Sequence, residues 1–217
     1  DLFYQLSPVH QLPATTDDQL PVGRNIGFGL TNSYTLLADL SQQNFSVQTL
    51  PSAPTESVLK TTQIVVLDDL VSFYSDSEIE ELREWISYGG RLILTINNSE
   101  AHQKANEILL GTGISIASVD PFNEMVIPTT PQSPFNGITE VGWINGSSVL
   151  AVDNNEKITI IDSQSRPLAA TSTFGEGVVM VFSNSLFNDS QLLQYQNRQL
   201  SQAVFNWSAE PPLWLEI

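Results

Sequence analysis

Short apolar runs alternate with helix-type patterns along the first half of the chain. Short apolar runs at 25–30 and 91–96 predict strands, and the run at 62–69 is rich in β-branched residues, as expected for a strand buried on both faces of a parallel sheet. Segment 45–50 alternates like a half-buried strand, and segment 34–43 places three leucines on one helical face: Leu36, Leu37 and Leu40. The order strand, helix, strand predicts parallel crossover units.

A long amphipathic helix is predicted at 75–90. Ser75 or Ser77 can cap it, acidic residues fill its first turn, and Gly89 with Gly90 ends it. Its expected buried stripe consists of four residues: Ile79, Leu82, Trp85 and Ile86. A further helix at 99–113 and a strand at 114–119 complete this half of the domain.

The pattern changes between about 120 and 172, where short alternating segments and turns indicate antiparallel strands. An apolar strand at 177–182 then returns to the main sheet. A final helix at 190–207 is expected to bury six residues: Leu192, Leu193, Leu200, Val204, Phe205 and Trp207.

These elements predict an α/β domain over residues 25–208. We expect a doubly wound, flavodoxin-like, mainly parallel sheet with helices on both faces and a strand-rich insertion at about 120–172. The apolar segments near 26, 64, 92 and 178 should lie side by side. Residues 1–24 are predicted to form an extended arm. The apolar tail 209–217 is expected to fold back on the body or to join a second copy of the chain.

The charge of the chain narrows the classes of partner. Eight Lys and Arg stand against 24 Asp and Glu, which gives a net charge of −16. Such a surface repels nucleic-acid phosphates and anionic lipid, so we expect neither partner. The charge serves solubility, with cationic partners or divalent cations as the functional alternative. No apolar run is long enough to span a bilayer, so no membrane insertion is expected.

The absence of cysteine excludes disulfides, thiolate nucleophiles and Cys-based zinc sites. Together with the start at Asp1, and with five Asn-x-Ser sequons, it favours a location outside the cytoplasm, although a cytoplasmic one stays open. The sequons begin at Asn44, Asn97, Asn145, Asn188 and Asn206.

Polar residues gather where the predicted parallel strands end, which is where open α/β sheets bind ligands. The candidate ligand-binding residues are Thr31, Asn32, Ser33, Asp68, Asp69, Asn97, Asn98, Ser99, Ser183, Asn184 and Asp189. Flavin, nucleotide or sugar binding is one interpretation of them. The alternative for Thr31, Asn32 and Ser33 is ordinary helix capping.

Two arrangements carry possible chemistry. Ser99 with His102 is the candidate for a weak hydrolase, but capping explains Ser99 without any chemistry, because Gln103 would complete a Ser-x-x-Gln capping box. Asp68 and Asp69 are carboxylates that Ca²⁺ or Mg²⁺ could bind, but consecutive strand residues point to opposite faces. We therefore expect no metal and no cofactor, and one of these two carboxylates should cap the following turn.

Several phrases resemble glutamine-amidotransferase-like domains. They are "SDSEIEELREWISYGGRLILTINN", "SPFNGITEV", "FGEGVVMVFSNSLFND" and "NRQLSQAVFNW". The similarity covers about 25–208, and it includes the branch formed by the module at the head of the 52-kilodalton intraflagellar-transport subunit and by auxiliary proteins of gliding-motility-type ABC transporters. The catalytic Cys and His of the true amidotransferases are missing after 91–96 and 177–182. The resemblance therefore implies a non-catalytic module that binds a protein partner or a glycan within a larger assembly.

Overall fold

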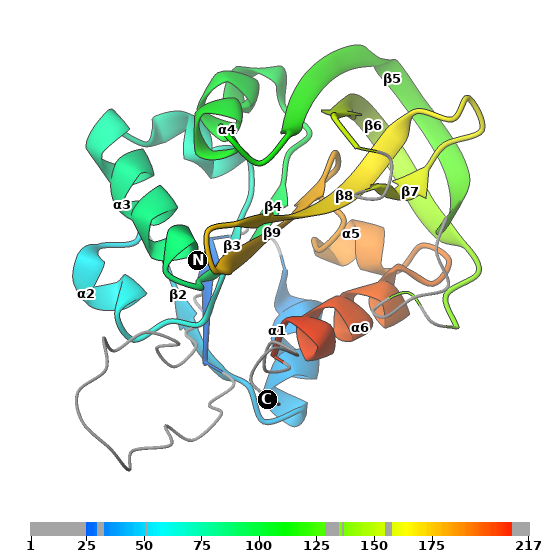
Figure 1. The fold of residues 1–217 in the computed structure, drawn as a ribbon. Helices are drawn as coiled ribbons and strands as arrows, with labels where there is room; N and C mark the ends of the chain where they lie inside the picture. Colours follow the sequence, from blue (N-terminus) through cyan, green and yellow to red (C-terminus); the bar gives the residue numbers. More distant parts are fainter. Residues whose placement is uncertain are drawn as a thin grey trace, which may run out of the picture.

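The computed structural model describes residues 25–29, 33–50, 52–128, 135, 137–154 and 158–209. Five strands are parallel: β1 (Asn25–Gly29), β2 (Ser46–Thr49), β3 (Ile64–Leu67), β4 (Arg91–Thr95) and β9 (Gly177–Phe182). Their order in the sheet is β2-β1-β3-β4-β9 (Figure 1). The prediction that the segments near 26, 64, 92 and 178 are neighbours is confirmed.

The other strands are antiparallel to their neighbours. β8 (Pro167–Phe174) pairs with β9, and β7 (Ile158–Ile161) pairs with β8. The long curved β5 (Ile114–Pro128) pairs with β6 (Val141–Val152) over most of its length, and only its last two residues pair with β7 (Figure 1). The predicted strand at 114–119 was thus too short. It continues past Pro121 because the register shifts there, and an irregular pairing tolerates the missing N–H of proline.

Helices cover both faces of the parallel strands. One face carries α1 (Tyr34–Gln42), α5 (Asp189–Leu192) and α6 (Asn197–Ala209), and the other carries α2 (Glu56–Leu59), α3 (Asp76–Ser87) and α4 (His102–Ile108) (Figure 1). Two 3₁₀ turns follow strands: η1 (Asp69–Phe73) and η2 (Ser99–Ala101). The predicted α/β class and the largely parallel sheet are confirmed.

Alternate strand residues supply two separate apolar cores. On β3, Ile64 and Val66 pack on the α1–α6 side, whereas Val65 and Leu67 pack on the α3–α4 side, as the two-residue period of a strand requires. Phe205 of α6 lies at the centre of an aromatic group in the first core. Its ring centroid is 6.2 Å from that of Phe28, 6.5 Å from that of Phe45 and 5.6 Å from that of Phe187.

The helix predicted at 75–90 is confirmed as α3. Ser75 caps it in a reciprocal capping box with Glu78. Ile79, Leu82 and Ile86 are buried, and Trp85 packs so closely over Gly90 that a Cβ there would come within 2.4 Å of the indole ring. Glycine at this position therefore allows β4 to begin directly beneath the helix.

Two predicted helices begin or end differently. Ser99 opens the 3₁₀ turn η2, and α4 begins only at His102, so the proposed capping box with Gln103 does not form; the side chain of Asn98 caps η2 instead. The helix predicted at 190–207 is divided into α5 and α6. Leu193, expected in the core, is 78% exposed between them, because the chain turns there and Tyr195 has a positive φ of 41°.

Part of the predictions falls outside the described residues. These are the arm 1–24, the tail beyond residue 209, and Thr31 and Asn32 of the loop after β1. Among the helices that the structure describes, none is long and apolar enough to cross a membrane.

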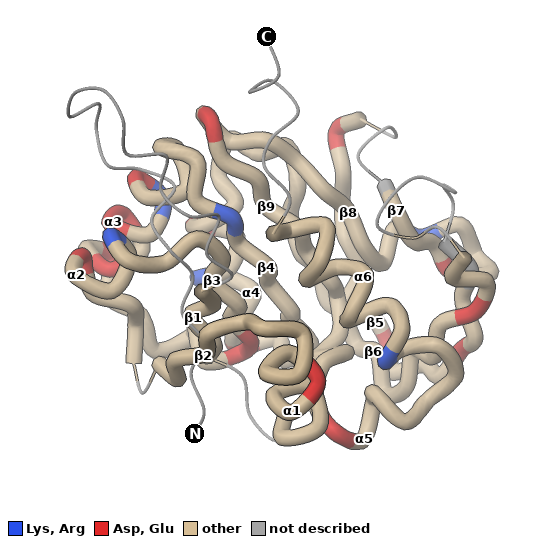
Figure 2. Tube along the Cα trace, turned by 90° about the horizontal axis from the view of Figure 1, so that it is seen from below, with Lys and Arg blue, Asp and Glu red and all other residues tan. Residues whose placement is uncertain are grey.

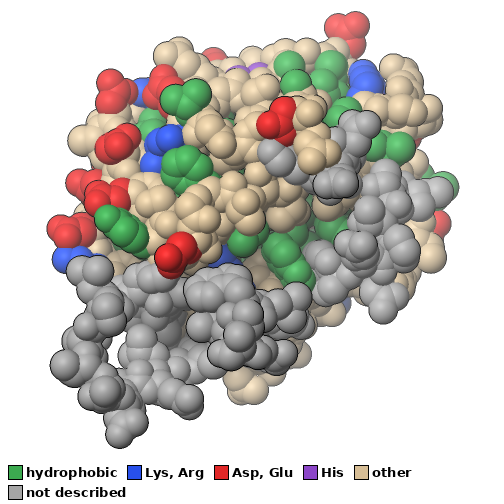
Figure 3. All heavy atoms as spheres, viewed as in Figure 1, with side chains coloured by type: hydrophobic (Ala, Val, Ile, Leu, Met, Phe, Trp, Pro, Cys, Tyr) green, Lys and Arg blue, Asp and Glu red, His purple; other side chains and the backbone are tan. Residues whose placement is uncertain are grey.

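Acidic side chains outnumber basic ones on the face seen in Figure 3. Asp and Glu segments occur along α3 and near α1 and α5 (Figure 2), and red side chains gather over α2 and α3 in the space-filling view (Figure 3). Figure 3 thus shows, on this face, the excess of acidic residues that the sequence contains.

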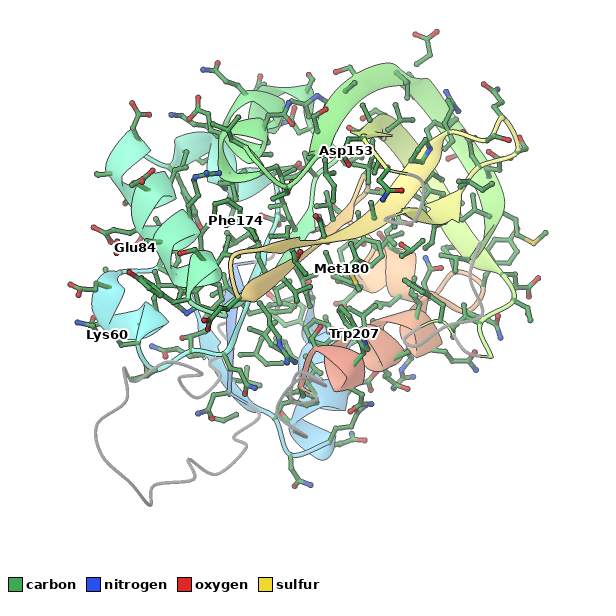
Figure 4. The ribbon with its side chains drawn as sticks, in the orientation of Figure 1. Lys60, Glu84, Asp153, Phe174, Met180 and Trp207 are labelled. Carbon is green, nitrogen blue, oxygen red and sulfur yellow. The ribbon has the colours of Figure 1, made fainter. Side chains whose placement is uncertain are left out.

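The basic side chains of the described residues all have intrachain partners. Two of the eight Lys and Arg, Arg24 and Lys157, lie outside the described residues. The other six contact acidic groups, carbonyls or aromatic rings. The pairs are Lys60 with Glu56, Lys104 with Asp76 and Glu107, Arg166 with Asp162, Arg198 with Asp39, Arg91 with the carbonyl of Ser208, and Arg83 with three carbonyls in and just after the last turn of α4. Arg83 also lies 4.7 Å from the ring centroid of Phe174, which projects beside α3 (Figure 4).

Candidate binding pocket at the carboxyl edge of the sheet

A cavity of about 130 Å³ lies where the parallel strands end. It is lined by residues that follow β1, β3 and β9 and by the last residue of β4: Ser33, Asp68, Asp69, Leu70, Thr95, Ser185, Phe187 and Asn188. β1 lies between β2 and β3: the chain crosses from β1 to β2 on one side and then from β2 to β3 on the other. Open α/β sheets bind their ligands at such a reversal of strand order, at the carboxyl ends of the strands.

The two adjacent carboxylates in the pocket have different partners. Asp68 is 5% exposed, and its Oδ1 accepts a hydrogen bond from the backbone N–H of Leu70, 3.0 Å away, which caps η1 as expected. Asp69 is half-buried, and its Oδ1 accepts from the backbone N–H groups of Asn97 and Asn98, both at 2.9 Å. Asp69 thus holds the end of β4 against the end of β3.

The first helix receives its cap from a distant part of the chain. Of the three residues named as possible caps, Ser33 occupies the N-cap position of α1, but its side chain makes no capping bond. Instead, Oδ1 of Asp189 accepts a hydrogen bond of 2.7 Å from the backbone N–H of Thr35. An intrachain carboxylate therefore occupies the helix terminus that would otherwise attract a phosphate group.

Asn97 joins the parallel strands to the antiparallel insertion. Its Nδ2 donates to the carbonyl of Asn145, and its Oδ1 accepts from the backbone N–H of Ser147 at 2.8 Å. Its own carbonyl accepts from the hydroxyls of Ser147 and Ser148. These bonds fix the middle of β6 at the carboxyl edge of the sheet.

His102 faces the insertion and not Ser99. Its Nε2 is 2.8 Å from the hydroxyl of Ser148, and its Nδ1 is 3.3 Å from that of Ser118. Burial lowers the pKa of the imidazole, and the nearby carboxylate of Asp69 partly opposes this shift. The bonds of the ring go to β5 and β6, so His102 is not positioned as a base for the exposed Ser99.

Ser183 and Asn184 follow β9 but lie outside the lining of the cavity. Both are buried. Asn184 and Gln191 each donate to the carbonyl of Ile144, at 3.1 and 2.8 Å. In the described part of the chain the hydroxyl of Ser183 and the side-chain oxygens of Asn184 and Gln191 have no hydrogen-bond partner. These residues contribute to the junction between β9, α5 and β6.

The structure therefore brings Ser33, Asp68 and Asp69 together in one pocket. The other described candidates lie outside its lining, and Ser99 among them is exposed at the start of η2. The sequence analysis missed five lining residues: Leu70, Thr95, Ser185, Phe187 and Asn188. Asn188 had a recognisable signal, because its side chain caps α5 and asparagine is a preferred N-cap. Within the described ranges, no three His, Asp or Glu side chains are grouped closely enough to hold a metal ion.

Solved structures with a similar fold belong to different kinds of protein. The mmIFT52 N-terminal domain has a TM-score of 0.70 at 16% identity, with 87% of this chain and 98% of that one covered. The cytoplasmic protein STM1381 from Salmonella typhimurium LT2 has a TM-score of 0.63 at 15% identity, with 83% and 89% covered. The exo-beta-1,4-mannosidase Op5Man5 from Opitutaceae bacterium strain TAV5 has a TM-score of 0.53 at 18% identity, with 82% of this chain but 31% of the mannosidase covered. At these identities the likeness shows the fold alone.

Among curated proteins, none matches the chain. A family model described as "Domain of unknown function (DUF4350)" matches residues 28–205, which is most of the sequence. The chain therefore belongs to the DUF4350 family.

Proposed function

We propose that the chain is a non-catalytic binding module that holds a protein partner at the carboxyl edge of its parallel sheet. The observation that carries the proposal is that the polar side chains at this edge are engaged in hydrogen bonds within the chain. Asn97 and His102 make intrachain hydrogen bonds to the insertion. Asp69 makes its hydrogen bonds between the ends of β3 and β4. Nucleophilic catalysis needs a nucleophile and a base within hydrogen-bond reach of each other, and Ser99 and His102 do not have this relation.

Two features argue against flavins and nucleotides as ligands. The carboxylates of Asp68 and Asp69 line the pocket, and Asp189 already occupies an N–H group at the start of α1. A phosphate group would meet like charge at both places. A neutral sugar, or a glycan of a partner, is the remaining small-ligand alternative, since the pocket also offers the hydroxyls of Ser33, Thr95 and Ser185.

We further propose that the module derives from the amidotransferase-like, doubly wound domains. The order β2-β1-β3-β4-β9 corresponds to the flavodoxin-like order of such sheets. The similar sequence phrases fall on α3 with β4 and on β9 with α6. After β4 and β9, where that family holds its catalytic Cys and His, this chain has Asn97 and Ser183. The similarity to the mmIFT52 N-terminal domain supports this relationship at the level of the fold.

A turnover screen tests the proposal. The purified chain is incubated with chromogenic amide, ester and glycoside substrates, beside the variants Ser99→Ala and His102→Gln. We expect no turnover above buffer for any of the three proteins. Turnover by the unmodified chain that either variant abolishes would contradict a non-catalytic role. A thermal shift with FMN, ATP or NAD would instead support the small-ligand alternative.

A further inference from the structure

We propose that the pocket at the carboxyl edge accepts a Lys or Arg side chain of the protein partner. The inference rests on the binding role proposed above and specifies the chemistry of what is bound. Its starting point is the lining of the cavity, in which two carboxylates stand beside three hydroxyl groups and no basic residue is present among the lining residues.

Asp69 is the group that would pair with the incoming cation. It is half-buried, and its two hydrogen bonds to the N–H groups of Asn97 and Asn98 both use Oδ1. The carboxylate is thereby held in one orientation, and Asp69 is one of the residues that line the cavity. A preoriented carboxylate loses little conformational freedom on pairing, and a hydrogen bond from a basic side chain to it is charge-assisted.

The chain has few cations of its own to offer. All six Lys and Arg of the described residues make contacts with other groups, and none lines the pocket. With a net charge of −16, the protein as a whole attracts cationic surfaces and repels anionic ones. A basic side chain therefore complements both the pocket and the field around it.

The periodicity of η1 places an exposed aromatic residue on the same side as one of the lining residues. Leu70 lines the cavity and Phe73 follows it by three residues in the 3₁₀ turn η1, where residues i and i+3 lie on the same side. Phe73 is 83% exposed, so its ring is accessible to a partner. Its ring can cover the aliphatic stem of a Lys or Arg, or interact with the guanidinium through its π face.

A bare metal ion fits this pocket less well than a basic side chain. Ca²⁺ takes six to eight oxygen ligands. Here Oδ1 of Asp68 and Oδ1 of Asp69 already accept hydrogen bonds, and the hydroxyl of Thr95 donates to the carbonyl of Leu67 at 3.3 Å. A guanidinium or ammonium group needs only acceptors, and the carboxylate of Asp69 is an acceptor that lines the pocket.

The test uses small neutral-ended peptides as probes. The ¹⁵N-labelled chain is titrated by NMR with acetyl-Gly-Arg-Gly-amide, acetyl-Gly-Lys-Gly-amide and, as the uncharged comparison, acetyl-Gly-Gln-Gly-amide. We expect the basic peptides to shift the amide signals of Leu70, Thr95 and Asn188, and the Gln peptide to leave them unchanged. Mannose and glucose are titrated in parallel.

Three variants locate the effect. Asp69→Asn keeps an oxygen for the N–H groups of Asn97 and Asn98 but removes the charge. It should raise the Kd of the two basic peptides roughly tenfold. Phe73→Ala changes a surface residue and should raise the Kd of the basic peptides roughly threefold. Glu84→Gln removes the same charge from the exposed face of α3 and should leave the Kd unchanged, since it lies on another element.

Several outcomes overturn the inference. If Glu84→Gln and Asp69→Asn weakened peptide binding equally, the attraction would be a diffuse one between charges and would not involve the pocket. If only the sugars shifted the amide signals, the ligand would be a glycan. Absence of binding by both basic peptides would also refute it. None of these results touches the non-catalytic role, which the turnover screen decides separately.

Discussion

The parallel strands and the β5–β6 ribbon are held in the molecule in different ways. β3 and β4 are buried at every position, with one apolar core on each side. β6 alternates between buried and partly exposed residues, and its position depends on side-chain amides that reach its backbone from β4, α5 and α6. Non-directional burial therefore stabilises the first region, whereas directional hydrogen bonds orient the second.

This difference bears on the proposed binding edge. The pocket is formed by the ends of the parallel strands, so its carboxylates rest on a rigid base. The β5–β6 ribbon reaches the same edge through Asn97. We infer that loss of the bonds to β6 would loosen the ribbon while the pocket keeps its shape, and that damage to the parallel core would affect both.

The largest effect is expected from Phe205→Ala, which attacks the parallel region. Phe205 is fully buried among three other aromatic rings, so truncation leaves a large cavity. We expect a loss of about 3–5 kcal/mol in the free energy of unfolding, measured by urea denaturation. The control is Leu193→Ala, 78% exposed, which should change it by less than about 0.5 kcal/mol. Equal effects of the two variants would show that the core is not placed as described.

Asn197→Ala attacks the insertion instead. The amide of Asn197 accepts from the N–H of Gly142 at 2.8 Å and donates to the carbonyls of Gly142 and Gln191, each at 2.9 Å. Because the site is buried, its loss leaves backbone groups unsatisfied, and we expect a cost of about 2–3 kcal/mol.

The result should also be local. Hydrogen exchange should accelerate at the β6 amides more than at those of β3 and β4. Asn206→Ala, which removes an exposed amide bonded only to Gln43, is the matched control and should leave both readouts unchanged. Uniform acceleration over all strands would mean that the insertion and the body unfold as one unit.

The parallel strands and the β5–β6 ribbon also differ in how well the sequence predicted them. The parallel strands and α3 were predictable because burial on both faces leaves uninterrupted apolar runs, and because Ser75 and Gly90 mark the ends of the helix. The length of β5 was not predictable, because Pro121 and the irregular register give its sequence the pattern of a loop. The long-range caps were equally invisible: nothing near Thr35 indicates that Asp189, 154 residues away, binds its N–H.

A smaller effect is expected from Asp189→Ala, which removes that long-range cap. The start of α1 loses an acceptor for the N–H of Thr35 and a favourable negative charge. We expect a loss of about 1 kcal/mol in the free energy of unfolding, measured by urea denaturation. Glu176→Ala makes the same charge change on the exposed turn between β8 and β9 and should be nearly neutral. If both variants lowered stability equally, the capping contact would not be the cause.

The smallest effect concerns pH and the contact of His102 with the insertion. Burial lowers the pKa of the ring in the folded protein, with the Asp69 carboxylate opposing, while both ring nitrogens face the hydroxyls of Ser118 and Ser148. Below about pH 6.5 the unfolded chain then binds the proton more readily than the folded one. His102 should therefore leave stability unchanged above that pH and lower it as the pH falls towards the folded pKa.

The loss of stability caused by protonation of His102 can be distinguished from that caused by acidic groups, because it occurs in a different pH range. Arg198, through its hydrogen bonds, lowers the pKa of Asp39, so that pair loses its stabilising effect only at much lower pH, below the usual range of an aspartate. We expect the Tm of the unmodified chain to fall between pH 8 and pH 5.5, and to fall less in His102→Gln, which keeps hydrogen-bonding groups but does not titrate. A fall of equal size in both proteins would assign the pH dependence to other groups, and the junction between α4 and the β5–β6 ribbon would then be insensitive to the protonation of this ring.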